Sequence, residues 1–266
     1  MFWFKKAYKK TGKRQYSWHP DLPDGRDFSF KLEAPGVTLP SKADLRSLCP
    51  PVQDQGDLGS CTAHALTGAV EVLETIDKLP VTMMSRLFVY FNERVIEHTV
   101  NQDAGAQLRD GIKALAQWGV CHETDWPYNP PAFTKNPNCL AFKNAAQHKI
   151  TSYQRLVTLS DLKACLAAGF PFVFGFTVYE SFESPDVAKT GVVPLPGPDE
   201  RCLGGHAVLG VGYDDFTSCF IVRNSWGPSW GQQGYFMIPY TYLANQNLAT
   251  DFWTIRRGNF MLKRPS

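Results

Sequence analysis

The sequence of 266 residues is long enough for one large domain or for two modest domains that share a cleft, and its 44% hydrophobic and 20% charged residues are ordinary for a globular protein. No apolar run approaches the roughly 20 residues that cross a bilayer, which excludes a membrane-spanning protein. The net charge of +2 is uneven, because residues 1–20 hold six basic and no acidic side chains, whereas the remainder holds 21 basic and 25 acidic ones.

Residues 1–38 are predicted to form an arm outside the main body. Prolines and glycines break any helical period there, and Phe28 and Phe30 indicate a short extended piece that lies on the body. The basic residues, with Trp3 and Tyr8 between them, could bind an anionic ligand or surface. A solubilising tail is the simpler interpretation, and the pattern does not predict nucleic-acid binding.

Residues 39–150 are predicted to form a mainly helical half. From residue 61 to 76, apolar side chains recur at spacings of three and four, which predicts a helix with Ser60 as its N-cap. Two further helices are expected at about 84–96 and 108–116, and Gly119 would end the second of these. Residues 124–149 are rich in proline and asparagine and predict a long crossing loop.

Residues 151–266 are predicted to form a β half, because the hydrophobic period changes from helical to two. Alternation is clearest over 172–177, and further strands are expected at 207–213, 219–223, 235–239 and 252–255. One helix interrupts at about 160–168, capped by Ser160 and ended by Gly169. The fold class is therefore α+β, with a seam between the halves where a cleft could form.

Seven cysteines, at positions 49, 61, 121, 139, 165, 202 and 219, cannot all pair within the chain. At least one thiol is left over if disulfides form. No spacing matches the paired short-spacer pattern of a structural zinc site, and a metal site built from Cys202 and His206 is the weakest interpretation. No metal and no cofactor is expected.

The segment from Gln55 to Cys61 carries the first chemical signal. A cysteine in the first turn of a helix sees the positive end of the helix dipole and unpaired backbone N–H groups, and both favour the nucleophilic thiolate. The N–H of Cys61 would face the oxygen that becomes negative during attack on a carbonyl, and Gln55 could supply a second donor to it. A buried cysteine that merely packs at the start of a core helix is the structural alternative.

Two later segments could complete the site. His206 follows two glycines, which leave space for its ring to face an open groove as a base for Cys61. Asn224 follows a predicted strand and could accept the N–H of the imidazole, with the indole of Trp226 packed over that bond. Each segment alone has an ordinary structural explanation, but together they supply nucleophile, base, orienter and oxyanion donor, the roles that acyl transfer requires.

Four blocks, in order along the chain, resemble the signature segments of the papain family of cysteine peptidases: residues 51–56 (PVQDQG), 59–61 (GSC), 205–208 (GHAV) and 224–235 (NSWGPSWGQQGY). The resemblance covers about residues 38–256. Residues 44–46 (DLR) and 119–121 (GVC) are similar to short bacterial members. His206 lies 145 residues after Cys61 and Asn224 lies 163 after it, close to the spacing known for cathepsins.

The resemblance implies a papain-like fold, with a helical half, an antiparallel β-barrel half and the active cleft between them. It also implies an endopeptidase that acts on a peptide or protein substrate through a thiolate–imidazolium pair. We expect a monomer. Secretion or a periplasmic location is suggested by the family, although Lys5 and Lys6 follow the apolar opening in an order that no secretory signal has.

The sequence departs from the family at several positions. Leu58 stands where a disulfide cysteine is usual, and Thr62 where an aromatic residue follows the nucleophile. Residues 103–106 (DAGA) replace the glycine-rich strand that pairs with the substrate backbone, so Gly105 and Ala106 are the expected contacts. Gly205, which leaves a pocket wall without a side chain, and Trp226 are the other candidate substrate contacts.

The arm departs most. Family proregions are usually long, helical and inhibitory, whereas residues 1–36 are short and interrupted by proline. We therefore expect a retained strap, structural or regulatory, that packs along the body.

Two other functions stay open on the sequence alone. A catalytically similar acyl transferase or deamidase would use the same side chains, and an inactive papain-like binding module would keep the fold without the chemistry.

Overall fold

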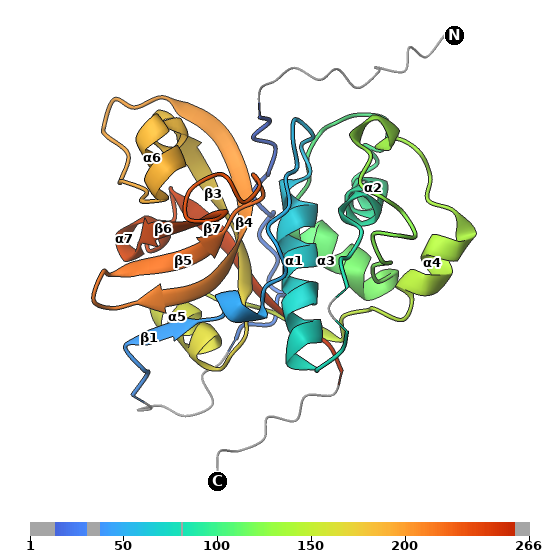
Figure 1. The fold of residues 1–266 in the computed structure, drawn as a ribbon, viewed down its shortest axis with the longest axis horizontal. Helices are drawn as coiled ribbons and strands as arrows, with labels where there is room; N and C mark the ends of the chain where they lie inside the picture. Colours follow the sequence, from blue (N-terminus) through green and yellow to red (C-terminus); the bar gives the residue numbers. More distant parts are fainter. Residues whose placement is uncertain (1–13, 31–37, 81, 259–266) are drawn as a thin grey trace.

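The structure is a computed structural model that describes residues 14–30, 38–80 and 82–258. A helical half and a half built on an antiparallel sheet lie side by side, and the long helix α1 stands between them (Figure 1). The helices are α1 (Cys61–Ile76), α2 (Arg86–Ile96), α3 (Leu108–Gln117), α4 (Cys139–Ala145), α5 (Leu159–Ala167), α6 (Pro185–Thr190) and α7 (Tyr240–Leu243). Short 3₁₀ turns occur at Arg46–Leu48, Pro130–Ala132 and Glu180–Glu183.

The strands are β1 (Lys42–Asp44), β2 (Ser152–Arg155), β3 (Phe172–Tyr179), β4 (Cys202–Asp214), β5 (Cys219–Arg223), β6 (Tyr235–Pro239) and β7 (Ala249–Arg256). They pair antiparallel in the order β2-β7-β3-β4-β5-β6, and β1 adds to the far end of β4. In the described pairing β2 and β6 are the ends of an open path. The α+β prediction is confirmed, but the expected closed barrel is an open antiparallel sheet.

Helix α1 begins at Cys61 and ends at Ile76, as the periodicity predicted. Residues 61–74 are all buried, because α1 packs against α2 and α3 on one side and against β4 on the other. Its two buried carboxylates are neutralised locally: Glu71 lies 2.6 Å from Arg86 at the start of α2, and Glu74 pairs with Arg257 and lies 2.6 Å from the His148 ring. The helix that carries Cys61 is therefore fixed by both halves, which suits a residue that has to be held at their seam.

Several local predictions were wrong. Ser60 precedes α1, but its hydroxyl contacts Tyr128 at 2.7 Å and makes no cap hydrogen bond. Helix α5 starts at Leu159, and a capping box between Thr158 and Asp161 opens it in place of Ser160. The predicted loop 124–149 contains α4, because Asn138 caps a short helix there through Ala141 N–H.

The arm contacts the body where an extended piece was expected. The backbone of Phe28 accepts from Arg155 N–H at 2.8 Å, and Phe30 N–H donates to Arg155 O at 2.8 Å, so the arm extends the sheet beside β2. The basic residues 5–13 with Trp3 and Tyr8 lie outside the described residues.

All seven cysteines are free thiols, so no disulfide replaces the one that the loss at Leu58 removes. Within the described parts of the chain, no helix is both long and apolar enough to cross a membrane.

Candidate active site

Cys61 lies at the first position of α1, facing β4, and is fully buried. The backbone N–H groups of Ala207, the residue after His206, of Thr62 and of Cys61 itself lie near its thiol. These donors lower the pKa of the thiol, but burial outweighs them and raises that pKa to about 12. With the site covered as it is here, Cys61 is a neutral thiol, in contrast to the thiolate expected from the helix dipole alone.

His206 and Asn224 meet as predicted. His206 Nε2 lies 2.9 Å from Asn224 Oδ1, and the indole of Trp226 stacks on the imidazole with 5.2 Å between ring centroids. His206 Nδ1 is buried and has no hydrogen-bond partner among the described residues. Burial lowers the pKa of His206 to about 4, although the bond to Asn224 opposes this. His206 lies within β4, which begins five residues earlier than predicted.

Gln55 is buried between the two halves and is held by both. Its Nε2 donates to Leu58 O at 3.0 Å on its own loop, and its Oε1 accepts from Ser225 Oγ at 2.5 Å. Gln55 N–H also donates to Ser225 O at 2.9 Å. The loop before α1 is thus tied to the residue after Asn224, which places all four predicted catalytic residues in one region of the seam.

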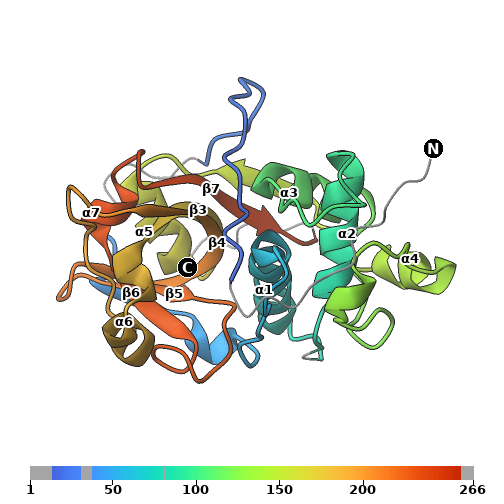
Figure 2. The same cartoon turned by 90° about the horizontal axis from the view of Figure 1, so that it is seen from above.

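The arm occupies this seam. The first part of residues 14–30, in dark blue, runs between β4 and α1, and the rest leaves as a loop and ends beside β2 (Figures 1 and 2). Trp18 N–H donates to Gly205 O at 3.0 Å, and His19 N–H donates to Ala106 O at 3.3 Å. Two of the residues predicted to contact substrate, Ala106 and Gly205, therefore pair with the arm, and this contact was not foreseen from the sequence.

Close packing of the arm depends on small residues. A side chain at Gly105 would overlap the carbonyl oxygen of Ser17, whose hydroxyl donates to Gly59 O at 3.0 Å. The indole of Trp18 is 5% exposed and fills a pocket where a side chain at Gly175 would overlap it. The sequence singled out Gly105 but missed Gly175, whose only signal was a glycine in the middle of a predicted strand.

Two further residues of the arm, Tyr16 and Arg14, cover the indole of Trp226 and the imidazole of His206. The Tyr16 ring packs edge-on against His206 with 6.3 Å between centroids, and its hydroxyl hydrogen-bonds to Glu183. The Arg14 guanidinium lies 4.1 Å from the centre of Trp226. The arm therefore passes over His206 from Trp226 toward Ala106 and helps to cover the region in which Cys61 and His206 are buried.

A cluster of charges anchors the arm further along. Asp21 accepts from Arg109 N–H at 3.1 Å, in the first turn of α3, where Gln107 provides no cap of its own. Arg155 reaches three carboxylates, Asp21 at 3.2 Å, Asp27 at 3.1 Å and Asp251 at 3.1 Å. Arg109 adds a bond of 2.7 Å to Asp27. Two guanidinium groups thus face three carboxyl groups, two of which belong to the arm.

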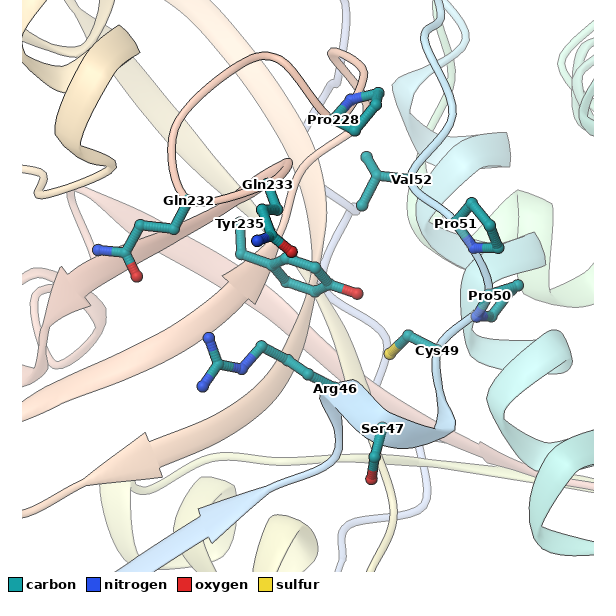
Figure 3. Close-up of a pocket in the computed structure, with 10 residues that line it drawn as sticks. All are labelled: Arg46, Ser47, Cys49, Pro50, Pro51, Val52, Pro228, Gln232, Gln233 and Tyr235. Carbon is teal, nitrogen blue, oxygen red and sulfur yellow. The ribbon is translucent and has the colours of Figure 1, made fainter.

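A wider pocket of about 710 Å³ lies between the segment that precedes α1 and the loop that leads into β6 (Figure 3). The residues that line it are Arg46, Ser47, Cys49, Pro50, Pro51, Val52, Pro228, Gln232, Gln233 and Tyr235. None of them is a predicted site residue, so this pocket is separate from the candidate active site. No group of three or more His, Cys, Asp or Glu side chains in the described ranges is placed to hold a metal ion.

The chain was compared with protein families and with known sequences. The family described as papain family cysteine protease matches residues 39–252. The chain is 42% identical to an uncharacterized peptidase C1-like protein, L477, of Acanthamoeba polyphaga mimivirus, over 92% of this chain and 88% of the viral protein. It is 28% identical to cysteine proteinase 3 of Entamoeba histolytica over 78% of this chain, and spans only 65% of that protein's length.

Comparison with solved structures agrees. Xylellain, a cysteine protease from Xylella fastidiosa, superimposes with a TM-score of 0.86 and is 45% identical over 95% of this chain and 98% of its own. The papain-like fold expected from the four sequence blocks is therefore confirmed. The chain belongs to the papain family of cysteine proteases and is a cysteine peptidase.

Proposed function

We propose that the chain is an endopeptidase in which Cys61 is the nucleophile, His206 the general base and acid, and Asn224 the residue that orients the imidazole. One observation carries the assignment. His206 Nε2 is engaged by Asn224 Oδ1 at 2.9 Å, so that Nδ1, which has no partner within the described chain, is the nitrogen left for the reacting groups. The stacked indole of Trp226 shields this bond from water.

The first half-reaction forms an acyl-enzyme. His206 takes the proton of Cys61, and the thiolate attacks the carbonyl carbon of the peptide bond. The negative oxygen that results accepts hydrogen bonds from Cys61 N–H and from the second N–H of Gln55, since the first already binds Leu58 O. The tetrahedral intermediate collapses to a thioester, and Nδ1–H of the imidazolium protonates the leaving amine.

The second half-reaction restores the enzyme. His206 removes a proton from a water molecule, which attacks the thioester carbonyl, and Cys61 leaves as a thiolate that is reprotonated. An amine in place of this water would give a transferase, and a side-chain amide in place of the peptide bond would give a deamidase. Neither alternative has an observation of its own in its favour.

Gly105, Ala106, Gly205 and Trp226 are proposed to contact substrate. The arm makes backbone hydrogen bonds to Ala106 and Gly205, and an extended peptide could make the same kind of bond once the arm has left. Since the arm and a substrate cannot bind the same backbone groups at once, residues 1–38 are proposed to act as a regulatory strap that holds the enzyme inactive. The halves 39–150 and 151–266 are proposed to form the two walls of the cleft.

Burial of the site under the arm also changes the protonation of Cys61 and His206. Burial raises the pKa of Cys61 and lowers that of His206, and both changes disfavour the thiolate–imidazolium pair. Departure of the arm would hydrate both groups and restore the pair. Inhibition would thus come from steric exclusion and from keeping the nucleophile protonated.

Alkylation of the full chain tests the proposal. With iodoacetamide at pH 6 we expect slow labelling of Cys61 in the unchanged chain and much faster labelling in Trp18→Ala, because Trp18 anchors the arm in its pocket. The matched control is Phe28→Ala, an arm residue whose side chain is 74% exposed. His206→Ala in the Trp18→Ala background is expected to return Cys61 to an ordinary thiol's slow rate. Fast labelling without His206 would overturn the assignment of the base.

Peptide assays complete the test. In the Trp18→Ala chain, a peptide library is expected to yield internal cleavages that Cys61→Ala abolishes. Formation of peptidyl-amine products, or release of ammonia from glutamine side chains without backbone cleavage, would replace the endopeptidase with the transferase or the deamidase. N-terminal sequencing after incubation decides whether the arm is retained, and clean loss near Leu39 with a rise in activity would contradict a permanent strap.

A further inference from the structure

The side-chain amide of Asn224 has two ends, and the protein binds only one of them. Oδ1 lies 2.9 Å from His206 Nε2 and accepts from Ser225 N–H at 2.8 Å. Nδ2 is buried and has no hydrogen-bond partner among the described residues. Because the two ends of an amide are nearly equal in shape, the same space would accept an amide turned by 180°, with its NH₂ facing the imidazole. That orientation would lose the bond to His206.

A second buried atom without a partner lies on the same side. His64 is in the first turn of α1, one turn from Cys61, and is 6% exposed. Its Nδ1 lies 2.9 Å from Ser60 O, which can only accept, so Nδ1 carries the proton. Its Nε2 is therefore an acceptor, and it too has no partner within the described chain. Burial lowers the pKa of His64 to about 3, which keeps the ring neutral.

His64 and Asn224 line the same small cavity. It holds about 10 Å³ and is bounded otherwise by Ala65, by three successive residues of β4 after His206, and by Arg223 and Ser225. A volume on the order of 10–15 Å³ admits one water molecule, provided that polar partners are present. Two of the residues that line it carry a buried polar atom without a partner in the described chain, a donor in Asn224 (Nδ2–H) and an acceptor in His64 (Nε2).

We propose that His64 is a positioning residue, which holds Asn224 in its productive orientation through one water molecule in this cavity. The water accepts from Asn224 Nδ2–H and donates to His64 Nε2. An amide turned by 180° could take the second hydrogen of the water, but it would point its NH₂ at His206 and at Ser225 N–H and lose both bonds to Oδ1. The two bonds to Oδ1 therefore select the orientation, and the water held by His64 satisfies Nδ2 and fixes the amide in that orientation. The inference rests on the proposed function in one respect, namely that Asn224 orients His206.

NMR on the full, unchanged chain tests the hydrogen bonds directly. Nitrogen-15 shifts of the His64 ring are expected to show a proton on Nδ1 and none on Nε2 from pH 5 to 8. The side-chain amide protons of Asn224 are expected to show cross-peaks to a long-lived water. A proton on Nε2, or an Asn224 amide without a bound water, would overturn the proposal, and neither reading depends on a variant that must fold.

Two substitutions at one position separate orientation from packing. His64→Phe keeps a ring of similar size without an acceptor, whereas His64→Gln keeps an acceptor. In the Trp18→Ala chain we expect His64→Phe to lower the rate of Cys61 alkylation about tenfold, a loss typical of outer-shell partners of functional histidines, and to shift its acid limb to higher pH. His64→Gln is expected to recover most of both effects. If His64 served only in packing, His64→Phe would lower the fraction of chains with a reactive Cys61 equally at every pH, and the acid limb would not move.

Asn224→Ala in the same background distinguishes this inference from the function on which it rests. If Asn224→Ala shifts the pH profile and His64→Phe does not, only the role of His64 is refuted. If Asn224→Ala leaves the profile unchanged, the role of Asn224 itself is wrong. Equal behaviour of His64→Gln and His64→Phe would also refute the positioning role.

Discussion

Gln55 has an amide that both halves of the cleft hold in place, by Ser225 Oγ on one side and Leu58 O on the other. The sequence predicted its role from its position six residues before Cys61, but not the contacts that fix it. A fixed donor stabilises a developing negative charge more than a mobile one does, because no reorganisation is needed during the reaction.

We therefore expect Gln55→Ala to lower kcat by about 10²–10³-fold with little change in KM, since the amide would act mainly in the transition state. Steady-state kinetics in the Trp18→Ala chain measure this. Gln53→Ala is the matched control, because Gln53 lies on the same loop and its amide binds Pro51 O at 3.0 Å and Met83 Sδ at 3.8 Å. A loss confined to KM would show that Gln55 contributes to substrate binding instead.

Gly175 decides what the pocket under the cleft can hold, because any side chain there would overlap the indole of Trp18. We expect Gly175→Val to expel Trp18 and so to accelerate Cys61 alkylation in the full chain. In the same variant, cleavage of peptides that place a bulky aromatic residue in this pocket should fall relative to those with alanine. Gly197→Val is the control, since open space surrounds Gly197. Unchanged labelling of Gly175→Val would contradict the blocking role of Trp18.

At the scale of elements, the start of α5 shows how local competition escapes a periodicity argument. Thr158 and Ser160 are both good capping residues and lie two positions apart, so composition does not choose between them. The structure chooses Thr158, whose hydroxyl accepts from Asp161 N–H at 3.1 Å while the Asp161 carboxylate accepts from Thr158 N–H at 2.9 Å.

Thr158→Ala is expected to lower the free energy of unfolding by about 1 kcal/mol, because it leaves an N-terminal N–H of α5 without its acceptor. Ser160→Ala removes an exposed hydroxyl inside the helix and should have no measurable cost. Urea denaturation followed by circular dichroism compares the two. The reverse order of effects would mean that Ser160 is the cap in solution.

The other elements also divide into those with a strong local period and those that depend on distant partners. Helix α1 and the strands β3, β5 and β6 have strong periods and were predicted to within a residue or two. Helix α4, β1 and β2 were missed because they are short, and their hydrogen bonds depend on partners far along the chain, such as β7 for β2. Strand β4 extends beyond its prediction because the glycines before His206 pair with β3.

At the scale of the whole molecule, the anchor of the arm brings together groups from four distant segments. Asp21 and Asp27 come from the arm, and they meet Arg109 of α3, Arg155 of β2 and Asp251 of β7. Burial, and then the nearby charge of Asp21, raise the pKa of Asp251 to about 6. Three ionised carboxylates would exceed the charge of the two guanidinium groups by one, so one bound proton makes the cluster neutral.

This pKa predicts how the arm responds to pH. Departure of the arm hydrates Asp251 and removes Asp21, so the pKa of Asp251 falls toward its ordinary value. The docked state thus binds the proton more tightly, and docking is strongest at acid pH and weakens as the pH rises through about 6. Fluorine NMR of 5-fluorotryptophan-labelled chain, with the Trp18 signal assigned by Trp18→Phe, is expected to show more released arm at pH 7.5 than at pH 5.

Asp251→Asn is the control for this prediction. Its amide is neutral throughout. The difference between the two chains in how steeply the released fraction of the arm changes with pH therefore isolates Asp251 from other titrating groups such as His206. We expect this difference to be largest between the ordinary value of 3.8 and about 6, where Asp251 is protonated only in the docked state, and to disappear above that range, where it is ionised in both states. Release of the arm on acidification in the unchanged chain alone would contradict the assigned sign.

By itself the sequence determined the helix that begins at Cys61, the α+β class, and the four blocks that identify the family, because period, glycine placement and local motif are short-range properties of the chain. Only the tertiary structure decided that Trp18 fills the pocket beside Gly175, that three carboxyl groups share two arginines, and that His64 and Asn224 line one cavity. These contacts join residues from distant segments, and burial then sets the charge on Cys61 and His206. Proximity and desolvation arise from packing, so no local pattern encodes them.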